Sequence, residues 1–120
     1  MIAAAVNRFA SAVDAMVAGF VREPDFADIV DVDLVSGTHR NPTAHSHRPE
    51  ELHAEVAAVG LDVEGPVAVE GIARLAPDLD TLLQDPATRS RVLGLVRATE
   101  SEPTLVGVSG HLLVAGRRAR

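Results

Sequence analysis

Apolar residues in the first 37 positions predict one strand and two helices. Residues 2–6 form a short apolar run, which predicts a strand, with Asn7 after it as a helix cap. Apolar residues then recur at helical spacing from residue 9 to 20 and again from residue 26 to 34, where Gly37 suits a helix end. The two stripes consist of Phe9, Val13, Met16, Val17 and Phe20, and of Phe26, Ile29, Val30 and Leu34.

Three more helices are predicted after a polar, aperiodic loop at residues 38–48. The first begins at Pro49, a residue suited to the first turn, and ends at Gly60. A short helix covers residues 79–83, and a longer one begins at Asp85-Pro86. Their expected buried residues are Leu52, Val56 and Val59 in the first, Leu79, Leu82 and Leu83 in the second, and Val92, Leu95 and Val96 in the third.

Two further strands are predicted in the second half of the chain. Residues 61–69 alternate in hydrophobicity, but Pro66 lies among them. Because proline cannot donate a ladder hydrogen bond, we expect this strand at a sheet edge or with a bulge. Residues 111–117 are apolar at both alternations, which predicts a strand buried on both faces.

The composition indicates one folded domain spanning residues 1–120. Hydrophobic residues make up 47% and charged residues 23%, which is typical of a globular protein. No apolar stretch approaches the roughly 18 residues of a membrane span, and the N-terminus lacks the pattern of a secretory signal. The absence of cysteine excludes disulfides and thiolate chemistry. A cytoplasmic location without membrane contact is therefore expected.

The charge pattern narrows the expected partners and chemistry. The net charge is −6, which argues against nonspecific binding to nucleic acid or anionic lipid. All 11 basic residues are arginine, so Schiff-base and lysine general-base mechanisms are excluded. Three phenylalanines are the only aromatic residues, which leaves few platforms for stacking bases or sugars.

Five short segments carry a resemblance to a known family. They are NRFAS at 7–11, THRNP at 38–42, HRPEEL at 47–52, VEG at 69–71 and SGHLLVAGRR at 109–118. Together they resemble the C-terminal half of a class I S-adenosylmethionine-dependent methyltransferase of the small-molecule type. Ala44, His45 and Ser46 stand where similar proteins often carry aromatic residues, which leaves the lining of the pocket open.

The resemblance implies an α/β fold with part of a Rossmann-like sheet. The family's sheet order is 3-2-1-4-5-7-6, with the last strand antiparallel. Residues 2–6 would then be the fifth strand, residues 61–69 the sixth strand at an edge, and residues 111–117 the central seventh strand. Helices at about residues 8–36 would form a cap.

The same resemblance leaves the cofactor without a site in these residues. The family holds S-adenosylmethionine on a strand, a glycine-rich loop and a helix, and no G-x-G-x-G or G-x-G-x-x-G spacing occurs here. We therefore expect a C-terminal fragment or truncated member that does not bind the cofactor alone and is inactive alone. The alternative is a non-catalytic dimerisation or ligand-binding module derived from that fold.

The resemblance also implies a substrate-binding set, Arg8, His39, Asn41, His47 and Arg48, which would cap the cleft for a small-molecule substrate. Arg8 follows the carboxyl end of the predicted first strand, where open α/β sheets bind ligands. His39 and His47 are the candidates for deprotonating a hydroxyl acceptor. No residue is assigned as catalytic.

Other groups have more ordinary interpretations. His39, His45, His47 and His53 could in principle bind zinc, but no adjacent carboxylate would orient them, so we expect no metal. If residues 45–47 are extended, His45 and His47 point to the same side. Glu70-Gly71 is interpreted as a turn after a strand, and His111 as a structural histidine. The apolar strand Ile2–Val6 would present an unpaired edge, so a homo-oligomer is expected through it.

Overall fold

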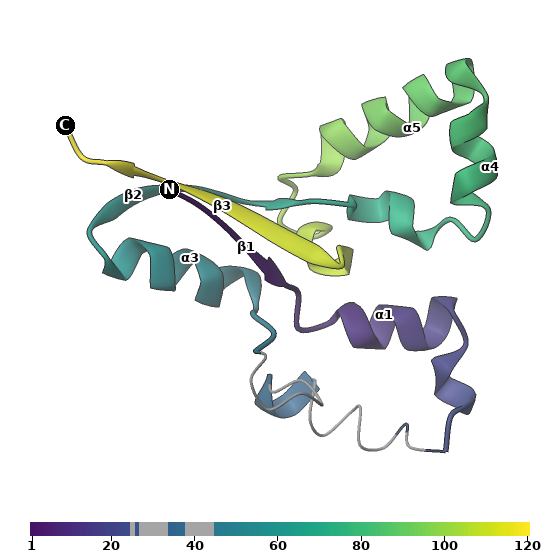
Figure 1. The fold of residues 1–120 in the computed structure, drawn as a ribbon, viewed down its shortest axis with the longest axis horizontal. Helices are drawn as coiled ribbons and strands as arrows, with labels where there is room; N and C mark the ends of the chain where they lie inside the picture. The colour runs from purple at the N-terminus through teal and green to yellow at the C-terminus, as the bar shows by residue number, and fades with distance from the viewer. Residues whose placement is uncertain (25, 27–33, 38–44) are drawn as a thin grey trace.

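The computed structural model describes residues 1–24, 26, 34–37 and 45–120. The described residues form a three-stranded sheet with helices and short 3-10 turns around it (Figure 1), so the fold is mixed α/β. The elements in chain order are β1 (Ile2–Val6), α1 (Ala10–Val17), η1 (Phe20–Arg22), α3 (Pro49–Ala58), β2 (Leu61–Ala68), η3 (Gly71–Leu75), α4 (Leu79–Gln84), α5 (Pro86–Thr99), η4 (Val106–Val108) and β3 (His111–Arg118).

The last strand lies in the middle of the sheet, in the order β1-β3-β2. It runs antiparallel to both neighbours, with Val6 opposite His111 on one side and Ala68 opposite Leu112 on the other. Strands β1 and β2 therefore point the same way, and their carboxyl ends meet at the same edge of the sheet as the amino end of β3. This placement agrees with the expected order of the three strands.

Strand β2 is an edge strand with a bulge, as the proline within it predicts. The pairing register with β3 shifts between Glu64 and Val67. Gly65 has a φ of +102°, and a β-carbon there would lie 3.0 Å from the Leu113 carbonyl oxygen. Glycine at position 65 therefore allows the backbones of β2 and β3 to approach each other closely. Pro66 needs no acceptor in the ladder because it has no N–H.

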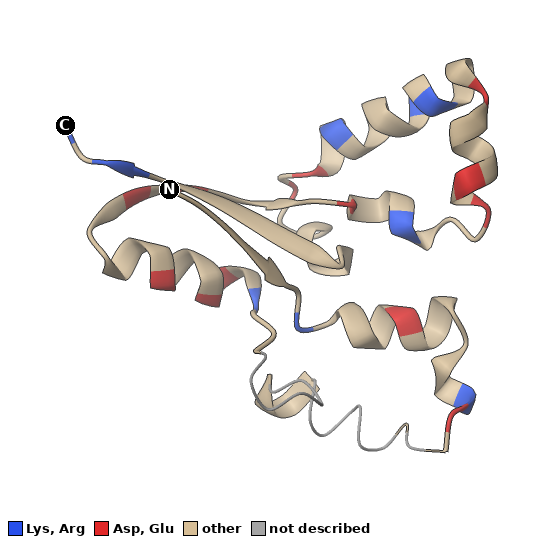
Figure 2. Cartoon of the chain, viewed as in Figure 1, with Lys and Arg blue, Asp and Glu red and all other residues tan. Residues whose placement is uncertain are grey.

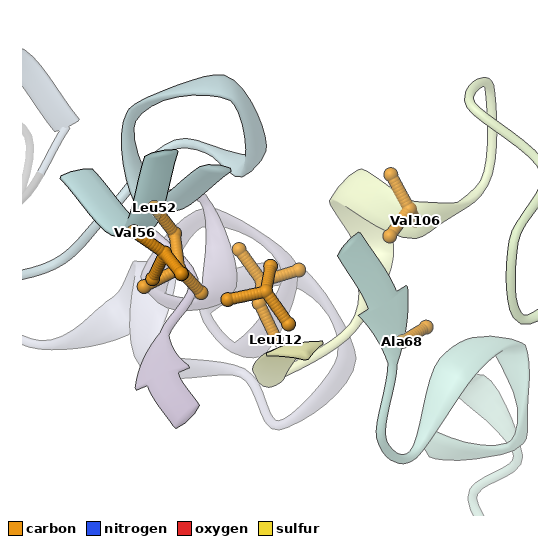
Figure 3. Packing of buried hydrophobic residues seen from close by; sticks show 6 residues of the cluster. Leu52, Val56, Ala68, Val106 and Leu112 are labelled. Carbon is orange, nitrogen blue, oxygen red and sulfur yellow. The ribbon is translucent and has the colours of Figure 1, made fainter. Parts of the chain in front are cut away.

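Helix α3 covers one face of the sheet and forms most of the core with it. Pro49 occupies the first turn, and the Glu51 carboxylate accepts a hydrogen bond of 2.9 Å from the Arg48 N–H. Leu52 and Val56 point from this helix toward Leu112 of β3 (Figure 3), and each such buried side chain contributes about 1.5–3 kcal/mol. The whole buried cluster is Leu52, Val56, Ala68, Val106, Leu112 and Val114.

Several residues expected in the core are instead exposed. Met16 is 75% exposed, Val59 67% and Leu95 57%. Helix α1 ends at Val17 because Gly19 has a φ of +80°, so Phe20 belongs to the separate turn η1 and is also exposed. Helical spacing identifies an apolar face, but burial requires a surface to cover it, and the described residues do not cover these side chains.

The central strand is buried more completely on one face than on the other. Leu112 and Val114 are fully buried against α3, whereas Leu113 and Ala115 on the opposite face are half-buried. The expectation of burial on both faces is therefore only partly met. Most of the second predicted stripe, residues 26–34, lies outside the described residues.

Among the described helices, none has the length and hydropathy needed to cross a membrane.

Candidate functional site

The candidate site lies at the sheet edge where β1 and β2 end and β3 begins. The Asn7 N–H donates to the Gly110 carbonyl at 2.9 Å, and the Val69 N–H donates to the His111 carbonyl at 3.1 Å. This edge is where open α/β sheets generally place ligands. Acidic residues occur on α3 and at the end of β2, and basic residues occur after β1 and on η3 (Figure 2).

Asn7 anchors the end of β1 to the loop that precedes β3. Its side chain is fully buried, and its amide donates to the carbonyls of Gly107 at 2.7 Å and Ser109 at 2.9 Å. The sequence predicts Asn7 as a helix cap, but this prediction is wrong. The residue directly before α1 is Phe9. A buried amide requires hydrogen-bond partners, and the loop carbonyls supply them.

Arg8 is buried and holds β1 to α3. Its Nη2 donates to Glu51 Oε2 at 2.7 Å, and its Nε donates to the Ser46 carbonyl at 3.3 Å. Only 6% of Arg8 is exposed, so the guanidinium is engaged inside the protein. The Arg48 N–H lowers the pKa of Glu51, and the charge of Arg8 lowers it further against the opposing effect of burial. Arg8 therefore positions the site and does not present a free cation.

His47 extends the edge beside the end of β1. Its N–H donates to the Val6 carbonyl at 2.9 Å, and its carbonyl accepts from the Arg8 N–H at 2.8 Å, as in a short parallel ladder. Its Nε2 lies 3.1 Å from Glu55 Oε2, while its buried Nδ1 has no hydrogen-bond partner among the described residues. The rings of His45 and His47 contact edge to face at 4.8 Å, so both lie on one side, as expected for an extended segment.

Of the three remaining residues in the predicted substrate set, Arg48 is among the described residues. The Arg48 guanidinium carbon lies 5.4 Å from the centroid of the Phe9 ring, an exposed cation–π contact at the same edge. His39 and Asn41 lie outside the described residues. The structure thus brings Arg8, His47 and Arg48 together around the end of β1.

Glu70, Ser109 and His111 form a second cluster at this edge. Glu70 Oε2 accepts from Ser109 Oγ at 3.0 Å and from the His111 N–H at 2.9 Å, and Glu70 Oε1 pairs with His111 Nδ1. Burial raises the pKa of Glu70, but hydrogen bonds from His111 and Ser109 outweigh it and lower that pKa to about 2. The His111 side chain is 56% exposed. An ionised Glu70 at Nδ1 orients this imidazole, a geometry suited to proton transfer at Nε2.

From the sequence, Glu70-Gly71 is predicted as a turn after a strand and His111 as a structural histidine. The sequence gives only a weak indication of this cluster. VEG follows one predicted strand and SGH precedes another, and only the sheet order brings the two strand ends together.

Arg74 connects the second cluster to helix α1. Its Nη1 donates to the Val108 carbonyl at 3.1 Å, and its Nη2 pairs with Asp14. A β-carbon at Gly110 would lie 3.3 Å from Glu70 Oε2 and 3.5 Å from the Arg74 guanidinium. Acidic and basic groups from α1, from the end of β2 through η3 and from the start of β3 are therefore held close together at one edge of the sheet.

A cavity of about 870 Å³ lies beside the start of α3 and the bulge of β2. Its walls come from the start of α3, from the bulge of β2 and from the segment between α5 and η4. Of the predicted substrate-binding residues that the structure describes, Arg8, His47 and Arg48, none lines this cavity. Its lining is Phe9, Pro49, Glu50, His53, Glu64, Gly65, Pro66, Val67, Ser101, Pro103, Val106 and Gly107.

Within the described residues, no group of three or more His, Asp or Glu side chains comes together as a metal site. His53 lines the cavity, whereas His45 and His47 contact each other. Comparisons of the chain with protein-family models, with curated proteins and with solved structures yield no match.

Proposed function

We propose that these residues are the substrate-side portion of a class I S-adenosylmethionine-dependent methyltransferase that acts on a small molecule. The observation that supports this best is the strand order β1-β3-β2, with β3 antiparallel to both neighbours. The family that the sequence resembles orders its fifth, seventh and sixth strands in this way. Five segments of sequence and the strand order thus support the same proposal, of which the Rossmann-like fold is a part.

The exposed apolar surface is consistent with a sheet that continues beyond β1. Ile2 is 73% exposed, and Val6 on the same strand is also exposed. The described residues pair β1 with β3 along one side, and only the end of β1 meets His47 on the other. In the proposed enzyme, a fourth strand pairs with the outer edge of β1.

S-adenosylmethionine does not fit the described residues. The nine glycines include no G-x-G pair, so the chain lacks the loop through which a backbone approaches this cofactor. The family binds the cofactor at the ends of its first four strands, which have no counterpart among the three described strands. We propose that cofactor binding and activity need additional protein.

The role proposed for these residues is to position the methyl acceptor. Methyl transfer depends mainly on alignment of acceptor and cofactor, because the sulfonium is already activated. Asn7 and Arg8 hold the end of β1 in place, and His47 and Arg48 lie at the edge where the acceptor would bind. His39 and Asn41 remain proposed members of the same substrate set.

The DNA directly upstream of the Met1 codon tests this proposal. It should encode, in the same or a shifted frame, a strand, a G-x-G-x-G loop and a helix. A protein that joins this segment to the 120 residues should bind S-adenosylmethionine in calorimetric titration, and a matched variant without the loop glycines should not. The 120 residues alone should show no binding. Micromolar binding by the 120 residues alone would contradict the proposal.

A second candidate is a non-catalytic dimerisation or ligand-binding module derived from the same fold. The exposed apolar side chains of α1 and η1, which include Met16, Val17 and Phe20, favour it. The absence of any cofactor-binding segment upstream, together with a stable dimer in solution, would select this candidate.

A further inference from the structure

His111 presents one ring nitrogen at the sheet edge where β1 and β2 end. Its Nδ1 pairs with Glu70 Oε1, whereas its Nε2 has no hydrogen-bond partner among the described residues. The His111 side chain is 56% exposed, so a ligand can reach this nitrogen. His47 differs, because its side chain is 16% exposed, its Nε2 is paired with Glu55 and its Nδ1 is buried. Of these two histidines, His111 is the one that can contact a ligand through its ring.

Glu70 determines which nitrogen of His111 carries the proton. Although burial raises the pKa of Glu70, hydrogen bonds from His111 and Ser109 lower it to about 2, so this carboxylate is ionised at neutral pH. An ionised carboxylate only accepts hydrogen bonds, so the Nδ1 that pairs with it is the donor. The neutral imidazole therefore carries its proton on Nδ1 and a lone pair on Nε2.

The Glu70 carboxylate is itself held in place by other groups. Its Oε2 accepts from the His111 N–H at 2.9 Å and from Ser109 Oγ at 3.0 Å. The Arg74 guanidinium also lies near, since a β-carbon at Gly110 would approach both groups, but it donates to a loop carbonyl and pairs with a carboxylate of α1. Glu70 Oε1 thus stays directed at the imidazole.

Two exposed valines flank His111 on the two neighbouring strands. Val6 lies opposite His111 in the ladder between β1 and β3. On the other side, the Val69 N–H donates to the His111 carbonyl at 3.1 Å and continues the register that pairs Ala68 with Leu112. Cross-strand partners project from the same face of a sheet, so both valines lie beside the imidazole. Val6 is 41% exposed and Val69 50%, so a ligand that reaches Nε2 also meets apolar surface.

We propose that His111 Nε2 accepts the proton of a hydroxyl group on an aromatic ligand, a phenol or a naphthol. The lone pair on Nε2 selects a group that donates a hydrogen bond, and the two valines favour an apolar ring. An aromatic hydroxyl donates more strongly than an alcohol because it is more acidic. On proton transfer the O–H bond breaks, the oxygen keeps the electron pair, and the imidazolium is stabilised by Glu70. That this hydroxyl is also the methyl acceptor rests on the proposed function.

Long-range proton–nitrogen correlation spectra of the 120-residue protein test the tautomer. At a pH where the imidazoles are neutral, such spectra distinguish a protonated ring nitrogen from an unprotonated one. We expect the proton on Nδ1 at His111. His53, which has no hydrogen-bond partner among the described residues, should instead show mainly the Nε2–H form of free histidine. Glu70→Gln should lose the preference at His111, because an amide donates as well as accepts.

A matched pair of ligands tests the hydroxyl. 2-Naphthol and 2-methoxynaphthalene share the ring system, but only 2-naphthol donates a hydrogen bond. Titrated into nitrogen-15-labelled protein, 2-naphthol should shift the Nε2 signal of His111. It should bind about threefold or more tightly than 2-methoxynaphthalene, a preference of the size of one hydrogen bond. His111→Phe keeps an aromatic ring without a nitrogen and should remove this preference, whereas the matched His53→Phe should keep it.

Three results would overturn the inference. The proton of neutral His111 could lie on Nε2, 2-naphthol could bind no more tightly than 2-methoxynaphthalene, or its preference could survive in His111→Phe. None of these measurements involves S-adenosylmethionine or the upstream segment, so failure here is distinct from failure of the proposed function.

Discussion

Glu70 and His111 are 41 positions apart in the sequence, yet their side chains pair where β2 ends and β3 begins. Glu70 also accepts hydrogen bonds from the His111 N–H and from the buried Ser109 hydroxyl. One carboxylate therefore links two strand ends and the loop between η4 and β3. Removal of this carboxylate should lower the free energy of unfolding, whether or not Glu70 takes part in a reaction.

Glu70 should make the stability of the protein dependent on pH in the acidic range. Its pKa is lowered from 4.5 to about 2, so its ionised form stabilises the fold above about pH 4.5. This contribution should be lost as the pH falls from 4.5 toward 2. After discounting for partial exposure, we expect about 1–2 kcal/mol. Urea unfolding across this pH range measures it.

The matched variants for this prediction are Glu70→Gln and Asp62→Asn. Glu70→Gln should be less stable than wild type at neutral pH and should lose less stability on acidification. Asp62 is an exposed residue of β2, the strand that precedes Glu70, and its variant should follow wild type. Parallel pH profiles for wild type and Glu70→Gln would show that Glu70 does not stabilise the strand ends.

Asn7→Ala should destabilise the fold strongly. The substitution removes two hydrogen bonds, of 2.7 and 2.9 Å, and leaves the carbonyls of Gly107 and Ser109 without this donor. Because Asn7 is fully buried, we expect a loss of about 2–4 kcal/mol in the free energy of unfolding. Asn7→Asp keeps the shape but places an oxygen against a carbonyl, so it should be at least as damaging. A loss below about 0.5 kcal/mol in either variant would contradict this anchor role.

Alanine should be tolerated less well at Gly37 than at Gly60. Both glycines have left-handed backbones, with φ of +71° and +81°, so alanine costs about 1 kcal/mol at each. At Gly37 a β-carbon would also lie 2.5 Å from Arg8 Nη2, whereas at Gly60 it meets nothing within 4 Å. Gly37→Ala should therefore lose about 1–2 kcal/mol more than Gly60→Ala in denaturant unfolding. Equal losses would mean that Arg8 moves aside freely.

The 120-residue protein should self-associate through the outer edge of β1. This edge is apolar, carries no charge and has exposed residues at Ile2, Ala4 and Val6. An unpaired apolar edge recruits another strand, and a lysine on it opposes pairing. Light scattering coupled to size exclusion should find dimers or larger species for wild type and a shift toward monomer for Ala4→Lys.

The control for the edge is Ala98→Lys, which adds the same charge at an exposed position of α5. It should associate like wild type. A wild-type protein that stays monomeric at high micromolar concentration would contradict the prediction.

The candidate site was only partly predictable. Arg8, His47 and Arg48 fall together because they follow or precede predicted elements, and the motif HRPEEL marks the start of a helix. The sequence does not reveal that Arg8 is buried against Glu51, since a buried and an exposed arginine look alike in a sequence. The pairing of Glu70 with His111 was missed because the two residues are far apart in the sequence and only the strand order brings them together.

Local patterns by themselves determined the elements: an apolar run for β1, a proline-started helix for α3, a proline-containing alternation for β2 and a doubly apolar run for β3. These patterns depend on backbone geometry within a few residues, so they can be recognised without knowing which other element packs against them. Only the tertiary structure decided which apolar faces are covered. Val56 of α3 is buried while Val59, the residue directly after this helix, is exposed, because α3 meets the sheet along one side. The same long-range packing placed Glu70 beside His111 and formed the cavity beside the start of α3, since both depend on strands and loops far apart in the chain.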